Sequence, residues 1–209
     1  MTSNIELTMP RRPGRPVGGD AEATRRRILE AGQEIFADMG FEATTFMAIG
    51  NRAGVTRPAV NHYFSSKSVL YRTVLGVVTN RVAEAADTAL RAPKLTDQLL
   101  GFIGEVIVSA EPSTARFLLQ SALDLARQPE LATSAEHHPG ATVDQFIRSA
   151  VNQAVSRGEV QADADSTALA EMFTAIFWGA ALALGRTDTE AGRVMDQLHG
   201  LFDGSLFTR

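Results

Sequence analysis

Apolar residues recur at the spacing of an α-helix along most of the chain, and glycines and prolines separate the periodic stretches. We expect a first helix from Ala21 to Met39, ending at Gly40, with three more close behind it. The later expected helices cover approximately residues 95–110, 112–128, 140–158, 166–186 and 188–206. Because no convincing strand or internal repeat is apparent, the sequence predicts an all-α fold.

Two short helices joined by a sharp turn are predicted next. Thr44 or Thr45 can cap the first helix, and Gly54 can take the positive φ that ends it. Thr56 can cap the second helix, and Pro58 falls in its first turn, where a missing N–H costs nothing. This arrangement fits a helix-turn-helix, whose second helix would enter the major groove of DNA. An ordinary helical hairpin in a core shares the same turn chemistry.

The residues around this hairpin favour a DNA-binding helix-turn-helix over an ordinary helical hairpin. They are Arg-Arg-Ile-Leu-Glu-Ala at 26–31, Phe-Ala-Asp-Met-Gly-Phe at 36–41 and Ser-Ser-Lys-Ser-Val-Leu at 65–70. With these flanks, residues 24–75 resemble the DNA-binding domain of the tetracycline-repressor (TetR) family. The resemblance implies a three-helix DNA-binding domain over residues 21–66 and a helical ligand-binding and dimerisation domain over residues 67–209. It also implies a homodimer that leaves double-stranded operator DNA when a small-molecule effector binds.

The same resemblance assigns the DNA contacts. The recognition-helix positions that commonly touch bases or backbone are occupied here by Arg57, Pro58, Asn61, His62 and Tyr63, and the phosphate-contacting positions by Thr45 and Lys67. The chemistry of two of these side chains, Arg57 and Asn61, agrees with contacts to DNA. An arginine can bond two acceptors of a guanine or hold a phosphate, and an asparagine can pair with an adenine through two hydrogen bonds. His62 can instead serve in packing or capping.

Residues 1–20 are expected to form a flexible basic arm, because prolines, glycines and arginines dominate them without any regular spacing. The run Arg12-Pro13-Gly14-Arg15-Pro16 resembles the core of an AT-hook, although Pro13 interrupts it. In an AT-hook an extended arginine pair lies along a narrow minor groove, so Arg12 and Arg15 are candidate DNA contacts. The alternative is a disordered tail.

Charge is divided unevenly along the chain. The formal net charge is −4, yet residues 1–75 hold 10 Lys+Arg and 7 Asp+Glu, whereas residues 76–209 hold 10 and 17. The basic end therefore carries the helix-turn-helix, and its charge would attract phosphates. No apolar run reaches the roughly 20 residues that span a bilayer, and the N-terminus lacks the apolar core of a signal peptide. We expect a cytoplasmic protein with no membrane partner.

The segment 166–186 is apolar nearly all round, so we expect it to be buried on two sides. Together with the amphipathic last helix it would pair with its copy in a four-helix dimer interface. Apolar candidates to line an effector pocket are Phe102, Val106, Phe117, Leu118, Phe146, Met172, Phe173, Phe177 and Trp178, with Gln120, Glu105, Asn152 and the Trp178 indole N–H as polar anchors. They favour a hydrophobic or aromatic effector, although any single one of the apolar residues is more often plain core than pocket lining.

Nothing in the sequence supports catalysis, a metal or a cofactor. Phosphate-binding, nucleophile-elbow and zinc-protease motifs are missing, and there are no cysteines to form disulfides or thiolate metal sites. His137 and His138 are adjacent and lack a third ligand at suitable spacing, so we expect a solvated loop there. Asp163 and Asp165 are expected to cap the helix that begins near Ser166. Two other classes stay open, a ligand-binding helical dimer without specific DNA recognition and an enzyme built on a helical bundle.

Overall fold

The computed structural model describes residues 17–108, 112–134, 137–161, 163–184 and 191–202. The helices are α1 (Val17–Ala43), α2 (Phe46–Ala53), α3 (Arg57–Tyr63), α4 (Lys67–Ala89), α5 (Leu95–Ile103), α6 (Pro112–Arg127), α7 (Pro139–Ser156), α8 (Ser166–Leu184) and α9 (Ala191–Phe202). A π-helical turn, Gly104–Val108, follows α5, and a 3-10 turn, Pro129–Leu131, follows α6. No strand occurs within the described residues, which confirms the predicted all-α class.

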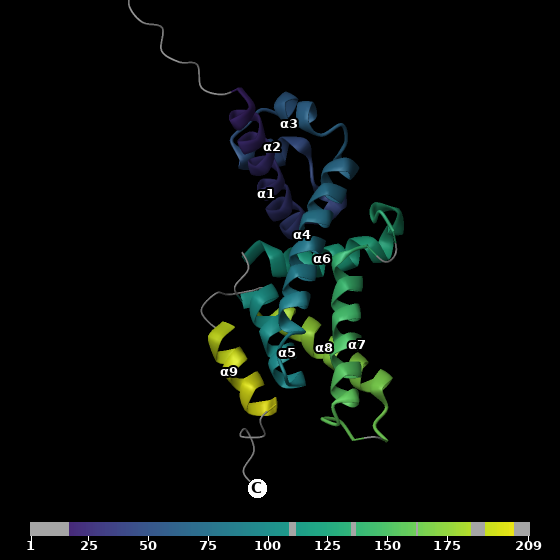
Figure 1. Ribbon diagram of the computed structural model, residues 1–209. Helices are drawn as coiled ribbons and strands as arrows, with labels where there is room; N and C mark the ends of the chain where they lie inside the picture. Colours follow the sequence, from purple (N-terminus) through teal and green to yellow (C-terminus); the bar gives the residue numbers. More distant parts are fainter. Residues whose placement is uncertain (1–16, 109–111, 135–136, 162, 185–190, 203–209) are drawn as a thin grey trace, which may run out of the picture.

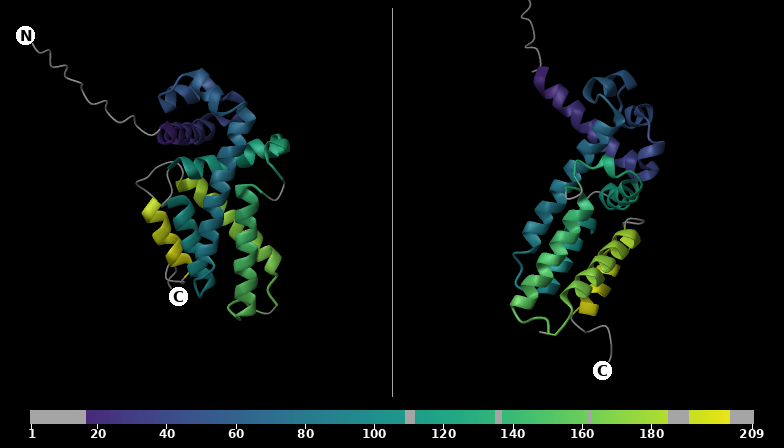
Figure 2. Two further views of the ribbon diagram at one scale, coloured as in Figure 1. Left: turned by 45° about the horizontal axis from the view of Figure 1, so that its top comes forward. Right: turned by 90° about the vertical axis from the view of Figure 1, so that its right-hand side faces the viewer.

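Two lobes are visible in Figure 1. We call α1–α3 (residues 17–63) the head and α5–α9 (residues 95–202) the body. The long helix α4 runs from the head down through the body, and α6 crosses beneath the head. The two further views of Figure 2 show the same division, with α4 and α6 where the lobes meet. The orientation of the head is therefore determined by the contacts that α4 and α6 make with it.

The first helix differs from its expected bounds at both ends. It begins at Val17, so the last residues of the expected arm are helical, and it continues past Gly40 to Ala43. At Gly40 the backbone leaves the helix, with φ 73° and ψ 173°, and one further turn follows. The expected stop at Gly40 is thus a break inside α1. The remaining residues of the arm, including Arg12 and Arg15, lie outside the described residues.

The predicted turn chemistry of the head is confirmed. The Thr45 hydroxyl accepts a hydrogen bond from the N–H of Ala48 at 3.2 Å, and Gly54 ends α2 at φ 67°. Gly50 allows the backbone of Val55, in the turn, to approach α2 closely, because a Cβ at Gly50 would lie 2.9 Å from the carbonyl oxygen of Val55. A compact core under these elements fixes α2 and α3 on α1, and it includes the buried side chains of Ile28, Phe36, Ile49, Val60, Phe64 and Leu70.

Helix α4 begins at a serine cap. The Ser66 hydroxyl accepts a hydrogen bond from the N–H of Val69 at 3.2 Å. Its buried face carries Leu70 and Val74 near the head and Val78 and Val82 further down. Helix α4 therefore contributes to the core of both lobes.

Candidate DNA-binding surface and effector region

The recognition helix α3 is held by a cap and by two buried side chains. The Thr56 hydroxyl accepts a hydrogen bond from the N–H of Ala59 at 3.3 Å, and Pro58 occupies the first turn, as predicted. Val60 is fully buried, and Phe64, the C-terminal cap residue, is buried as well. These two residues fix the rotation of α3 about its axis, so its opposite face is directed away from the core.

The side chains on that opposite face are the predicted DNA contacts. Arg57, Pro58, Asn61 and His62 are exposed, whereas Tyr63 is half-buried. The rings of His62 and Tyr63 lie edge to face, with centroids 5.4 Å apart. An arginine, an asparagine and a histidine on one exposed helical face supply the donors and acceptors that base edges and phosphates bind.

The recognition helix is also contacted by an arginine of α1. The guanidinium carbon of Arg25, on α1, lies 5.4 Å from the centroid of the Phe64 ring. Arg25 thus contacts the residue that caps the recognition helix. The two residues are distant in sequence, so no local pattern indicates their contact.

Lys67 is directed toward the end of α1. Its ammonium group donates a hydrogen bond to the carbonyl oxygen of Glu42 at 2.9 Å and lies 4.5 Å from the centroid of the Phe41 ring. The predicted phosphate contact Thr45, in contrast, remains exposed. Its hydroxyl proton is free to bond a phosphate while its oxygen caps α2.

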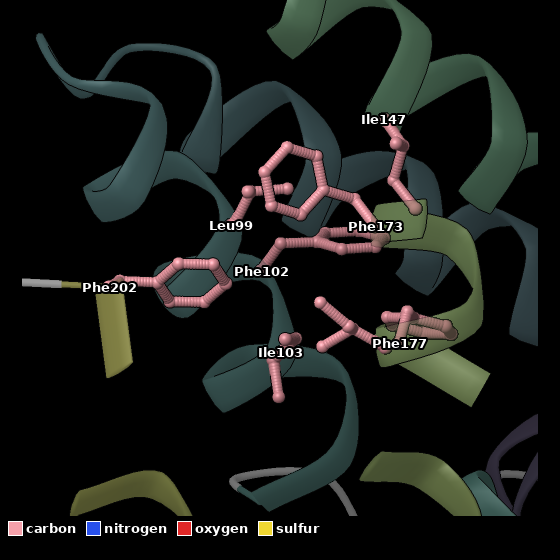
Figure 3. A pocket seen from close by; sticks show the side chains of 8 residues that line it. Leu99, Phe102, Ile103, Ile147, Phe173, Phe177 and Phe202 are labelled. Atoms are coloured by element: carbon pink, nitrogen blue, oxygen red, sulfur yellow. The ribbon is translucent and has the colours of Figure 1, made fainter. Parts of the chain in front are cut away.

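Four of the predicted pocket residues gather in the body. The Phe102 ring stacks on Phe146 at 3.9 Å and on Phe177 at 5.4 Å, and Phe173 lies beside Phe202 at 5.8 Å. Figure 3 shows side chains from α5, α7, α8 and α9 converging around a small apolar cavity, which we call the aromatic cavity. It is lined by Leu99, Phe102, Ile103, Ile147, Phe173, Ile176, Phe177 and Phe202.

The aromatic cavity is nearly filled by its own lining. Its volume is about 10 Å³, which is roughly one water-sized sphere. An organic molecule therefore enters only if side chains such as Phe202 move. Buried core residues and pocket-lining residues share one apolar pattern, so the sequence does not predict the other residues of the lining, which are Leu99, Ile103, Ile147, Ile176 and Phe202.

The other predicted pocket residues lie elsewhere. Phe117 packs against Tyr71 below the head, with ring centroids 5.8 Å apart, and Gln120 donates to Asp124 at 3.0 Å on the same helix. Trp178 is half-buried, with its ring 5.5 Å from that of Phe177. The polar candidates Glu105 and Asn152, like Met172, are exposed. Hence Trp178 lies beside the aromatic cavity, whereas Phe117 and Gln120 belong to the junction between head and body.

Two further features concern ligand binding, the histidine at the start of α7 and a hollow beside α4. His138 caps α7, since its Nδ1 accepts a hydrogen bond from the N–H of Ala141 at 3.3 Å. Among the described residues, no group of three histidines or carboxylates is placed to hold a metal ion. A more open hollow of about 380 Å³ lies beside α4 and is lined by Arg72, Leu75, Gly76, Thr79, Asn80, Thr133, Ser134 and His137.

Comparison with known proteins agrees with this geometry. A family model described as bacterial regulatory proteins of the tetR family matches residues 28–74. A second model, described as the tetracyclin repressor-like C-terminal domain, matches residues 93–198. The first match contains the helix-turn-helix, and the second contains α5–α8 and most of α9.

Individual relatives are regulators too. The HTH-type transcriptional regulator UidR of Escherichia coli K12 is 24% identical over 163 residues, which are 77% of this chain and 81% of the relative. The HTH-type transcriptional activator FasR of Mycolicibacterium smegmatis is 36% identical over 97 residues, 43% of this chain and 44% of the relative. The solved structure of the ketosteroid transcriptional regulator KstR2 of Mycobacterium tuberculosis is 18% identical and aligns over 88% of this chain and 95% of its own, with a TM-score of 0.70. The chain therefore belongs to the TetR family of transcriptional regulators, which are not enzymes.

Proposed function

We propose that this protein is a homodimeric repressor that binds a palindromic operator and releases it when a small hydrophobic or aromatic effector enters the body. The observation that carries the proposal is the exposed face of α3, where Arg57, Asn61 and His62 project from a helix fixed by Val60 and Phe64. We assign DNA binding to residues 21–66, with the arm residues that precede α1 in the adjacent minor groove, and effector binding and dimerisation to residues 67–209. Operator binding takes place in the cytoplasm.

The proposed contacts divide into two groups. Arg57 and Asn61 read base edges, because their side chains can each make two hydrogen bonds to one base. Thr45, Pro58, His62 and Tyr63 lie along the sugar-phosphate backbone and fix the register of α3. Arg12 and Arg15 of the arm add minor-groove contacts. Phosphate contacts supply affinity that falls with salt, whereas the two base contacts supply specificity.

The exposed face of α8 supports the proposed dimer. Ala168, Met172, Ala175, Gly179 and Leu182 recur at alternating spacings of four and three residues, and all are exposed. Of the apolar window Ser166–Ala183, only 28% is buried inside the chain, although its length and composition alone would suffice for a membrane span. A second copy, related by a twofold axis, would cover this seam in the manner of a coiled coil. The small residues at its centre allow the two helices to approach closely.

The aromatic cavity supports the proposed class of effector. Every side chain that lines it is a hydrocarbon, so a ligand there gains by leaving water and finds no side-chain partner for hydrogen bonds. An effector shifts the protein toward the DNA-incompetent form only if it binds that form better. We take the filled cavity to be that of the DNA-competent form, so a ligand that displaces Phe202 or Phe177 binds the other form better and meets this condition.

Selection of a random DNA library on the purified protein, near physiological salt, tests the proposal. We expect enrichment of an inverted repeat whose half-sites lie about one or more helical turns apart. Retention that depends on salt but not on sequence would instead support the alternative, a ligand-binding helical dimer without specific DNA recognition. A reporter gene placed behind the selected site then distinguishes repression from activation.

A further inference from the structure

One buried carboxylate joins the head to the body. Asp124, on α6, is only 7% exposed. Its Oδ2 accepts hydrogen bonds from the backbone N–H of Phe41 at 3.0 Å and from the hydroxyl of Tyr71 at 3.2 Å. Its Oδ1 accepts a third from Nε2 of Gln120 at 3.0 Å. A side chain of α6 thus holds α1 and α4 at the same time.

The break in α1 makes the first of these bonds possible. In a continuous helix the N–H of Phe41 would bond to the carbonyl of Ala37. The positive φ of Gly40 turns this N–H toward α6 instead. A Cβ at Gly40 would lie 2.7 Å from Nε2 of Gln120, so the Gln120 amide would have to move from its place beside Asp124. Gly40 on α1 therefore supports the contact with Asp124 on α6, because its backbone conformation frees the N–H of Phe41 that the carboxylate binds.

Packed aromatic rings surround the carboxylate. Tyr71 lies edge to face with Phe36 and with Phe41, at centroid distances of 4.9 and 5.2 Å. Burial, followed by the neighbouring Asp124, raises the pKa of Tyr71, so its hydroxyl stays protonated and remains a donor. Both hydrogen bonds to Oδ2 are shielded from water. Removing one partner would therefore leave a buried polar group without a hydrogen bond and would lower the stability of the junction.

Other polar contacts also join α1 to α6. Nε2 of Gln33 donates to the hydroxyls of Ser113 and Thr114 at 3.0 and 3.1 Å. Arg116 pairs with Asp38 at 3.5 Å, in a partly exposed position. These pairs connect α6 with α1 alone, whereas Asp124 also holds α4, the helix that continues into the body.

We propose that Asp124 is a positioning residue that fixes the angle of the head and thereby the half-site spacing that the dimer accepts. This inference rests on the proposed binding of an inverted repeat by a dimer. In a twofold dimer a tilt of one head is repeated in the other, so a loosened junction changes the separation of the two recognition helices. Asp124 contacts no DNA in this scheme. It acts through Phe41 and Tyr71.

The test compares operators that differ only in spacing. The selected repeat is synthesised with one or two base pairs added or removed between its half-sites, and affinities are measured near physiological salt. For the native protein we expect a sharp optimum. Asp124→Asn places an amide NH₂ against existing donors, and we expect about a tenfold loss at the optimum, the equivalent of one charged hydrogen bond. At neighbouring spacings the loss should be several-fold smaller, so the profile flattens.

Two further variants keep the test decisive. Asp38→Asn removes an exposed α1–α6 ion pair with the same change of charge, and it should keep the native profile. Tyr71→Phe removes one bond to Asp124 but keeps the ring, so it should flatten the profile partially even if Asp124→Asn fails to fold. A uniform loss at every spacing, or an unchanged profile, in the folded variants would overturn the inference. If the native protein itself selects no inverted repeat, the proposed function fails instead.

Discussion

Lys67, the first residue of α4, donates a hydrogen bond from its ammonium group to the carbonyl oxygen of Glu42 in the last turn of α1, at 2.9 Å. The positive charge lies at a helix C-terminus, where carbonyl groups lack partners and the helix dipole favours a cation. It also lies 4.5 Å from the centroid of the Phe41 ring. The resemblance to the family implies a phosphate contact for this lysine. In the structure its ammonium group instead interacts with the carbonyl of Glu42 and the ring of Phe41.

From this geometry we expect Lys67→Met to lower the free energy of unfolding by about 1 kcal/mol, measured by urea denaturation. The slope of log affinity for DNA against log salt concentration should stay as it is in the native protein. A phosphate contact would give a different result, because its loss reduces that slope by about one.

Gly40 should tolerate no side chain. We expect Gly40→Ala to lower the free energy of unfolding by about 2 kcal/mol or more, because φ 73° with ψ 173° is nearly closed to other residues and the new Cβ meets Gln120. Gly76→Ala is the matched control, since a Cβ there has no neighbour within 4 Å and a helix gains about 0.5–1 kcal/mol from alanine. Equal effects of the two substitutions in thermal or urea unfolding would refute this explanation.

Dimerisation should depend on the exposed seam of α8. Leu182 is 59% exposed, and we expect Leu182→Glu to give a monomer in analytical ultracentrifugation, because two charges would face each other near the twofold axis. Leu123→Glu on α6, where the leucine is 54% exposed, should remain dimeric. Dissociation of the Leu123 variant, with the Leu182 variant intact, would place the interface elsewhere.

Effector binding should be visible in the fluorescence of Trp178, the only tryptophan of the chain, because its ring contacts Phe177 of the aromatic cavity. In a screen of apolar and aromatic compounds, those that release the operator should also change this emission. Ile147→Phe should abolish the release while leaving DNA affinity intact, because its larger ring takes the place that a ligand would need in the aromatic cavity. Val155→Phe, at an exposed position of the same helix, is the control. Normal release by the Ile147 variant would move the effector to another site, such as the hollow beside α4.

Base reading by Arg57 has a specific signature. We expect Arg57→Ala to cost about 1–3 kcal/mol of operator binding and to relax the preference at one base pair of each half-site. Arg91→Ala, an exposed arginine close to the far end of α4, should change neither. A uniform loss across all sequences would show that Arg57 holds a phosphate.

Local features of this fold were predictable from the sequence, and contacts between distant segments were not. The caps Thr45 and Thr56 are predictable because a cap and its partner lie within three residues of each other. Asp165 likewise caps α8, by accepting hydrogen bonds from the N–H groups of Thr167 and Ala168. The continuation of α1 past Gly40 was missed, because the N–H of Phe41 finds its acceptor 83 positions away in the sequence.

The effector region was predicted less well, for a physical reason. Phe102 and Phe117 each lie on the buried face of a helix. Phe102 nevertheless lines the aromatic cavity, whereas Phe117 packs under the head. Periodicity shows which face of a helix is buried, but not which helix lies against it. The exposed residues of α3 do not have this ambiguity. The cap Thr56 and the buried residues Val60 and Phe64 are local to α3, and together they determine which of its side chains are exposed.

The most direct test of the account is the ratio of two affinities measured at one salt concentration near the physiological value. One duplex carries the selected inverted repeat, and the other has the same length and base composition in scrambled order. We predict that the native dimer binds the repeat about 10³-fold more tightly or better, as specific regulators do. Equal affinities for the two duplexes would contradict the central claim that α3 reads a DNA sequence.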